Sequence, residues 1–213
     1  MIVETFPVGM LQCNCTILGC ETTKEAIVVD PGGEAERIKA AVEARGLKVV
    51  KIVHTHAHFD HVGATREVQE QWDGAETLLH EGDDWLIEGF REQPLMVGMM
   101  FDTGPPPRID TALEGGMELR FGEQCSLVLH TPGHTPGSCC FSLRTPEGML
   151  LLSGDTLFNM GVGRTDFPRG SYEQLQTSIR DQLLALDGRT RVIPGHGPET
   201  TIENERRLNP FLQ

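Results

Sequence analysis

Apolar positions in the first half of the chain form two kinds of pattern, which follow one another. Short apolar or alternating runs are typical of strands, and apolar residues three and four apart are typical of helices. The runs that predict strands are "IVETFPV", "CNCTILGC", "EAIVVD", "KVVKIVHT" and "ETLLH". The segments that predict helices are "EAERIKAAVEAR" over about residues 34 to 45, ended by Gly46, then "VGATREVQEQW" and "EGDDWLIEGF".

The second half opens with strands and closes with helices. The predicted strands are "MELRF", "CSLVLHT", "SCCFSL", "GMLLLSG" and "RVIPG". Helices are predicted over about residues 171 to 186 and near 200 to 208. The periodicity by itself indicates an α/β or α+β protein. Two β-rich halves with interleaved helices favour two sheets packed face to face with helices outside, a four-layer αββα sandwich of the α+β class. We expect residues 1–213 to form a single domain.

Residues 93–116 interrupt this rhythm. The segment "QPLMVGMMFDTGPPPRIDTALEGG" is rich in Pro, Gly and Met, which predicts a long loop. Long ordered loops in compact domains often act as lids over a site. Methionine-rich segments can also fill gaps in a core. Both interpretations stay open at this stage.

Composition and charge limit the possible partners. The chain has 38% hydrophobic and 23% charged residues, as globular proteins do, and its 31 acidic and 18 basic residues give a net charge of −13. This charge argues against a nucleic-acid partner, which requires clustered Lys and Arg. No apolar run approaches the roughly 18 residues that span a bilayer. The start "MIVETFPVG" carries Glu4 and no basic region, so we expect no signal peptide and a cytoplasmic location.

Six cysteines occur without a CxxC pair, and a cytoplasmic setting would keep them reduced. Cys13 and Cys15 would lie on one face of a strand, where a metal pair is conceivable. The simpler interpretation is that they are small buried apolar residues.

The stretch "VHTHAHFDHVG" concentrates half of the eight histidines of the chain. His56, His58, Asp60 and His61 form the pattern H-x-H-x-D-H between a predicted buried strand and a predicted helix. Side chains two apart on an extended chain share a face, so His56 and His58 can bind one ion together. Asp60 and His61 fall at the turn and can face a second ion. Imidazole with carboxylate suits divalent Zn, Fe or Mn, whereas the alternative is a solvent-exposed histidine loop.

Three further candidate ligands repeat one arrangement, an apolar strand followed by a turn and a metal-binding side chain. They are His134 in "HTPGHTPGS", Asp155 in "LLLSGDTLF" and His196 in "RVIPGHGP". Loops at strand ends are where sites are built. With the first four, these make five histidines and two aspartates. Two ions need about that many ligands when one carboxylate bridges and a water completes the shell.

The motifs resemble those of the metallo-β-lactamase superfamily and, within it, the hydroxyacylglutathione hydrolases or glyoxalase II enzymes. The short bacterial type without the C-terminal helical domain is the most similar. The segments that carry the resemblance are "VVDPGGEAERI", "THAHFDHVG", "TPGHTPGS", "SGDTLFNMGVGRTDFPRGS" and "VIPGHGPETTIENERRLNPFL". The resemblance covers nearly the whole chain and implies the four-layer metallo-β-lactamase fold.

The resemblance also implies a ligand scheme for two divalent metal ions, zinc first, with iron or manganese as alternatives. The scheme assigns His56, His58 and His134 to the first ion, Asp60, His61 and His196 to the second, and Asp155 to both.

Four other residues receive expectations outside the ligand set. Asp30 would orient the ligand loop through hydrogen bonds, or would cap the "PGG" turn that follows it. We expect His54, His80 and His130 to be structural.

The implied reaction is hydrolysis of a small-molecule thioester such as S-D-lactoylglutathione to glutathione and a hydroxy acid. A hydroxide that bridges the two metals would attack the thioester carbonyl, and Asp60 could accept a proton. Arg164 in "GVGRTDFPRG" would contact the glutathione moiety, or would pair with Asp166 instead. Arg169 is interpreted as a surface charge.

Three alternatives stay open. A persulfide dioxygenase would use one iron, held by the positions of His56, His134 and Asp155. Another hydrolase, such as a lactonase, would use the same fold; the expected location disfavours a β-lactamase, and the charge disfavours an RNA-processing enzyme. A non-catalytic binding module would be expected to lose ligands, and all seven are present.

Overall fold

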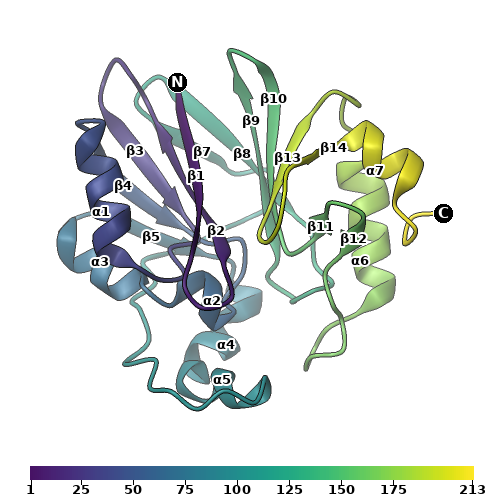
Figure 1. Ribbon diagram of the computed structural model, residues 1–213, viewed down its shortest axis with the longest axis horizontal. Helices are drawn as coiled ribbons and strands as arrows, with labels where there is room; N and C mark the ends of the chain where they lie inside the picture. Colours follow the sequence, from purple (N-terminus) through teal and green to yellow (C-terminus); the bar gives the residue numbers. More distant parts are fainter.

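The computed structural model describes residues 1–213 and shows two mixed six-stranded sheets that pack face to face. Helices cover the outer faces of both sheets, with α1 and α3 beside the first sheet and α6 and α7 beside the second (Figure 1). The predicted four-layer αββα sandwich is therefore confirmed.

The first sheet has the strand order β1-β2-β3-β4-β5-β6 and turns from antiparallel to parallel at β3. Its strands are β1 (Ile2–Val8), β2 (Cys13–Gly19), β3 (Glu25–Val29), β4 (Lys48–Val53), β5 (Glu76–Leu79) and β6 (Thr111–Ala112).

The second sheet has the order β14-β13-β10-β9-β8-β7, and only β10 and β13 are parallel neighbours. Its strands are β7 (Glu118–Phe121), β8 (Gln124–His130), β9 (Cys139–Thr145), β10 (Gly148–Gly154), β13 (Arg191–Pro194) and β14 (Thr200–Thr201). A separate small hairpin pairs β11 (Leu157–Phe158) with β12 (Gly161–Val162).

The helices are short. They are α1 (Ala35–Ala44), α2 (Phe59–Val62), α3 (Thr65–Gln71), α4 (Asp84–Glu88), α5 (Gln93–Met96), α6 (Tyr172–Ser178) and α7 (Ile202–Leu208). Single turns of 3-10 helix occur at Glu81–Asp83 and Phe90–Glu92. None of the helices has the length and apolar composition that crossing a membrane requires.

Strand β3 shows why continuous apolar runs form these sheets. Ile27 and Val29 face the second sheet and join the apolar layer between the sheets. Ala26 and Val28 face the other way and pack in a layer with Ile38 of α1. Because both faces of the strand are buried from Ala26 to Val29, these four positions are all apolar, with no polar alternation.

Two predicted segments differ from the structure. The loop expected over residues 93–116 begins with helix α5, which Pro94 favours because its fixed φ suits the first helical turn. The helix expected over residues 171–186 ends as α6 at Ser178 and continues as a π-helix over Ile179–Leu183. Buried apolar residues recur four apart in this segment, a spacing that one wider turn keeps directed at the sheet.

All six cysteines are unpaired, and five of them are buried. Cys13 and Cys15 both belong to the apolar layer between the first sheet and α1. They therefore pack as small apolar residues, as the simpler interpretation predicted.

Candidate metal centre

Loops that follow strands β3, β4, β8, β10 and β13 meet at one edge of the two sheets. These strands run in a common direction within each sheet, so their carboxyl ends lie together. All seven predicted ligands lie in these loops or in the first turn of α2. The fold thus brings together side chains that are up to 140 residues apart (196 − 56) in the sequence.

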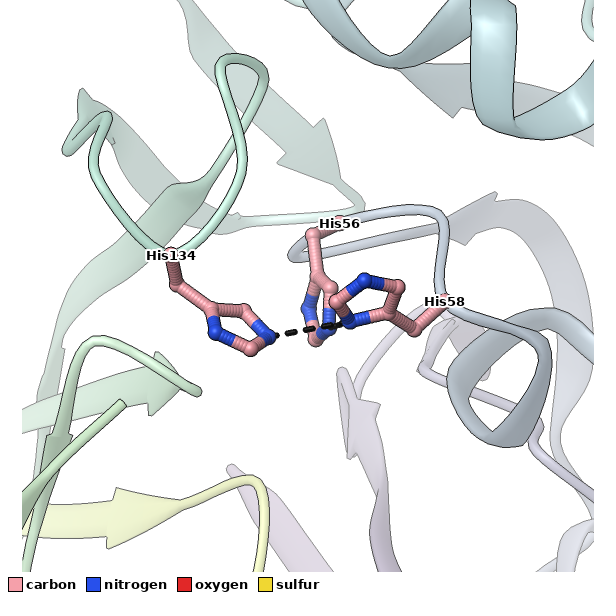
Figure 2. Close-up of side chains that lie close together, drawn as sticks. All are labelled: His56, His58 and His134. Carbon is pink, nitrogen blue, oxygen red and sulfur yellow. Dashed lines mark hydrogen bonds between the residues drawn. The ribbon is translucent and has the colours of Figure 1, made fainter. Parts of the chain in front are cut away.

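The first group consists of His56, His58 and His134. The Nδ1 atom of His58 lies 3.0 Å from Nε2 of His56 and 2.9 Å from Nε2 of His134. Figure 2 shows the three rings pointing toward one another from two different loops. Three ring nitrogens converge on a common point, which is the arrangement of a three-histidine metal site.

The second group consists of Asp60, His61 and His196. The Nε2 atom of His196 lies 3.1 Å from Oδ2 of Asp60 and 3.2 Å from Nε2 of His61. Asp60 and His61 lie inside α2, which begins at Phe59, so they are helical and not in a turn before a helix near residue 62 as expected. The His61 ring also lies close to the first group, with its centroid 4.1 Å from that of His56.

Asp155 lies between the two groups. Its Oδ2 atom is 3.6 Å from Nε2 of His134 and 3.8 Å from Nε2 of His196, and its Oδ1 atom is 3.4 Å from Nε2 of His61. Oδ1 is buried and has no hydrogen-bond partner. A buried carboxylate oxygen without a partner is costly unless a cation binds it. The position of Asp155 therefore suits a carboxylate shared between two ions.

The outer nitrogen of each of three histidines is held by a hydrogen-bond acceptor. Nδ1 of His134 donates to the carbonyl of Arg164 at 2.7 Å, and Nδ1 of His196 donates to the carbonyl of Leu11 at 3.0 Å. Nδ1 of His61 donates to Oδ2 of Asp30 at 2.9 Å. These acceptors keep the ring proton on Nδ1, which leaves the Nε2 lone pair directed into the site, as in metal-binding histidines.

Asp30 connects His61 to Thr55 in the loop that carries His56. It is buried, and its Oδ1 atom accepts from the Thr55 backbone N–H at 2.7 Å. Its Oδ2 atom accepts from the Thr55 hydroxyl at 2.6 Å as well as from His61. Thr55 Oγ1 lies in turn 3.1 Å from Nδ1 of His56. The Asp30 carboxylate thus faces the ligand loop, where the expected orienting role places it, and does not cap the turn after it.

The protonation states of the histidines and aspartates in the two groups bear on whether these residues can bind cations. Burial, together with the neighbouring histidines, lowers the pKa of His56 well below its usual value and that of His58 to about 3, so both rings are neutral. Burial alone would raise the pKa values of Asp60 and Asp155, but His61 and the other histidines hold both below the ordinary value. The neutral imidazoles of the first group and the two ionised carboxylates are the ligand states that divalent metals require. Burial lowers the pKa values of His61 and His196, but acidic neighbours raise both above the usual value, so a metal ion would displace a proton from each ring on binding.

Asp83 is a site residue that the sequence reasoning missed. It is fully buried, and burial raises the pKa of its carboxyl group. Its Oδ2 atom accepts from the Ala57 N–H at 3.1 Å and the Thr135 hydroxyl at 2.7 Å, and its Oδ1 atom accepts from the Gly137 N–H at 2.7 Å. Asp83 therefore ties the loop of His56 to the loop of His134. Its place in the segment "EGDDWLIEGF", which predicts a helix, gave no sign of this role.

Gln93 was also missed, because it lies in the segment expected to be a loop. Its side chain is buried and accepts from the Phe59 N–H at 2.8 Å. Its amide donates to the carbonyls of Ala57 at 3.0 Å and Leu86 at 2.8 Å. Gln93 thereby fixes the backbone on both sides of His58.

The remaining histidines lie outside both groups, as expected. His54 is fully buried, with Nε2 3.3 Å from the Thr65 hydroxyl. His80 and His130 stack on each other with ring centroids 4.0 Å apart, and Nδ1 of His80 accepts from the Gly82 N–H. Cys13 lies behind the site, 3.4 Å from Nδ1 of His61, and burial raises its pKa to about 12, so it is a neutral thiol.

A cavity of about 240 Å³, the inner cavity, opens onto both groups. It is lined by Leu11, His58, Phe59, Asp60, Gln93, Met96, Val97, His134, Asp155, Arg164, Phe167 and His196. Met96 and Val97, at the start of the 93–116 segment, therefore lie against the site. Gln93 also lines the inner cavity and holds the backbone around His58 by its hydrogen bonds.

Arg164 lies at the inner cavity and is also engaged elsewhere. Its Nε and Nη2 atoms each donate to a different carboxylate oxygen of Asp166 at 2.7 Å. Its guanidinium lies over the Phe167 ring, 3.8 Å from the centroid. The expected pair with Asp166 is present, and the expected contact with glutathione stays a prediction for a residue that lines the cavity.

A family model described as the metallo-beta-lactamase superfamily matches residues 8–196. The chain belongs to this superfamily. Membership of this superfamily supports the conclusion that the chain is a metal-dependent hydrolase.

Two of the relatives that span nearly the whole chain are named as hydrolases. "Probable metallo-hydrolase YqgX" of Bacillus subtilis is 40% identical over 97% of this chain and 95% of its own length. "Hydroxyacylglutathione hydrolase GloC" of Haemophilus influenzae is 39% identical over 100% of this chain and 98% of its own.

Three solved structures are similar to this chain over nearly its whole length. TTHA1623, solved in a di-iron-bound form, is 41% identical with a TM-score of 0.86 and covers 98% of this chain and 100% of its own. The BLEG-1 B3 metallo-beta-lactamase is 36% identical with a TM-score of 0.86 over 99% of both chains. ETHE1 from Myxococcus xanthus is 26% identical with a TM-score of 0.78 over 99% of this chain and 84% of its own.

Proposed function

We propose that this chain hydrolyses a small-molecule thioester, such as S-D-lactoylglutathione, with two divalent metal ions bound by the seven residues of the two groups. The observation that carries the proposal is the convergence of five imidazoles and two carboxylates beside one open cavity, which five of these seven residues line. The relative named as a hydroxyacylglutathione hydrolase supports the thioester as substrate.

The donor set fits zinc first, with iron as the alternative that the di-iron-bound neighbour supports. His56, His58 and His134 would hold one ion, and Asp60, His61 and His196 the other, with Asp155 shared. Bound there, the ions would supply an activated water as nucleophile and polarise the substrate carbonyl.

Residues of the chain supply the rest of the reaction. Water adds to the thioester carbonyl, the C–S bond breaks, and the sulfur leaves with its electron pair as a thiolate of low basicity. Asp60, which lines the inner cavity, is placed to accept the proton that the attacking water loses. Nη1 of Arg164, which is not used by Asp166, can donate to a substrate oxygen. Phe59 and Phe167 line the inner cavity and limit access of bulk water to it.

A comparison of two reactions on one preparation tests the proposal. Metal content is quantified, and S-lactoylglutathione hydrolysis and glutathione-persulfide-dependent oxygen consumption are measured side by side. We expect two metals per chain and thioester hydrolysis, abolished in His58→Ala and retained in the matched variant His80→Gln, which lies outside the site. One iron per chain with oxygen consumption would instead identify the persulfide dioxygenase.

A further inference from the structure

A second, larger cavity adjoins the inner one. This outer cavity has a volume of about 480 Å³ and lies between the loop at residues 9–11, the loop at 32–35, the start of α3 and residues 101–103. It shares Leu11, Phe59 and Asp60 with the inner cavity. The carbonyl of Leu11 accepts from Nδ1 of the candidate ligand His196, so the boundary between the cavities is fixed to the site. A molecule that reacts in the inner cavity can extend into the outer one.

The surroundings of the two cavities are unusually apolar for an exposed surface. Seven of the twelve large apolar side chains that the protein leaves exposed lie in two segments, residues 10–11 and 95–101. Met10, Leu11 and Phe101 line the outer cavity, and Met96 and Val97 line the inner one. A concentration of exposed apolar side chains around a cavity is typical of a surface that binds an apolar ligand.

The negative charge of the outer cavity disfavours binding of a substrate that carries carboxylates. Its acidic lining residues besides Asp60 are Glu34, Glu67 and Asp102, and no basic side chain lines it. Glu34 is paired with Arg37 at 3.0 Å, whereas Glu67 and Asp102 have no basic partner. The one basic residue of the inner cavity, Arg164, is paired with Asp166. Glutathione carries two carboxylates, and neither cavity offers them a free cationic side chain.

From this geometry we infer that the outer cavity binds the end of the substrate distant from the scissile bond, and that this end is an apolar chain without carboxylates. The inference rests on the proposed thioester hydrolysis and narrows its substrate class. The preferred substrates are thioesters of uncharged, apolar thiols, and S-lactoylglutathione is a poorer member of the class.

Three lactoyl thioesters with different thiols test this assignment on the purified metal-loaded enzyme. The thiols are glutathione, which is anionic, N-acetylcysteamine, which is short and neutral, and N-octanoylcysteamine, which is long and apolar. Full burial of one methylene increases binding about fourfold, so partial burial of the added six predicts at least a ~10-fold higher kcat/KM for the octanoyl than for the acetyl compound. We expect the glutathione ester to have the lowest kcat/KM of the three.

Reversing the charge of one lining residue, Glu67, tests the electrostatic part of the assignment separately from the apolar part. Glu67→Lys should raise kcat/KM for the glutathione ester, relative to kcat/KM for the neutral acetyl ester of the same variant, ~3- to 10-fold at low salt. The matched control is Glu123→Lys, which changes the net charge equally at the exposed turn between β7 and β8, outside both cavities, and should have no effect.

The outcomes distinguish the two levels of the proposal. A glutathione ester that is the best substrate, with Glu67→Lys and Glu123→Lys behaving alike, would overturn the assignment of the outer cavity while leaving thioester hydrolysis intact. Failure to hydrolyse any of the three esters would overturn the proposed function itself.

Discussion

Gly195 allows a test that disturbs the two metal groups without removing any ligand. A Cβ atom at this position would lie 2.2 Å from Oδ1 of Asp155 and 2.8 Å from Cε1 of His61. The backbone cannot retreat, because its N–H donates to the Gly154 carbonyl at 2.8 Å and its carbonyl accepts from the Asn14 N–H at 2.7 Å. In Gly195→Ala, the Asp155 carboxylate must therefore move by about 1.2 Å, the difference between an ordinary contact of 3.4 Å and 2.2 Å.

A shift of this size exceeds the roughly 0.2 Å by which metal–ligand distances vary. We expect Gly195→Ala to bind metal at least ~100-fold more weakly and to lose hydrolytic activity in proportion. The fold should persist, because Gly195 does not have the positive φ that alanine avoids and the two shortest contacts are with side-chain atoms, while the Gly154 carbonyl carbon lies 3.0 Å away. Metal affinity is measured by competition with a chromophoric chelator, and folding by the thermal unfolding of the metal-free protein.

The matched control for this variant is Gly161→Ala. A Cβ atom at Gly161 would meet only Phe158, at 3.7 Å and 3.8 Å, which are ordinary contacts. This variant should bind metal as the wild type does. The reasoning is refuted if Gly195→Ala retains two metals with wild-type affinity, since Asp155 would then not be needed at its observed position.

Three further substitutions probe the supports of the site. Asp83→Asn replaces an oxygen that accepts hydrogen bonds with an NH₂ group that faces a donor; the free energy of unfolding in urea should fall by ~2–4 kcal/mol, against under ~0.5 kcal/mol for the exposed neighbour in Asp84→Asn. An unchanged urea midpoint for Asp83→Asn would contradict its role in tying the loops together. Thr55→Val removes the hydroxyl between Asp30 and the ring of His56 and should weaken metal binding ~10- to 100-fold in a chelator titration; wild-type affinity would show that this link is dispensable. Arg164→Ala should lower kcat/KM ~3- to 10-fold, equally for anionic and neutral thioesters, because Asp166 already occupies two of its donors; a loss confined to the anionic ester would indicate a carboxylate site.

The layers of the fold and the seven clustered side chains could be predicted because local sequence specifies both. A strand segment that is buried on both faces is apolar throughout, as Ala26 to Val29 of β3 are, and the sequence shows this pattern directly. His56, His58, Asp60 and His61 are neighbours along the chain, and His134, Asp155 and His196 each follow a strand and a turn. The carboxyl ends of strands that run in the same direction lie at one edge of a sheet. A ligand that directly follows such a strand in the sequence is therefore expected at that edge.

The supports of the site were hidden because they depend on tertiary contacts. Asp83 stands in the acidic run "EGDD", where it resembles the exposed Asp84 beside it. Its burial follows from the close approach of the loop at residues 135–137, where a Cβ on Gly137 would lie 2.6 Å from the Asp83 carboxyl carbon. Gln93 was obscured by the Pro, Gly and Met residues that follow it, whose composition predicts a loop whatever a single glutamine does.

The most direct test of the two-metal site is to locate the metals in crystals of the purified protein by anomalous scattering. We predict two peaks roughly 3.5–4 Å apart, one among His56, His58 and His134 and the other among Asp60, His61 and His196, with Asp155 contacting both. A density map with no anomalous peak between these side chains, from a preparation that hydrolyses thioesters at full rate, would contradict the account.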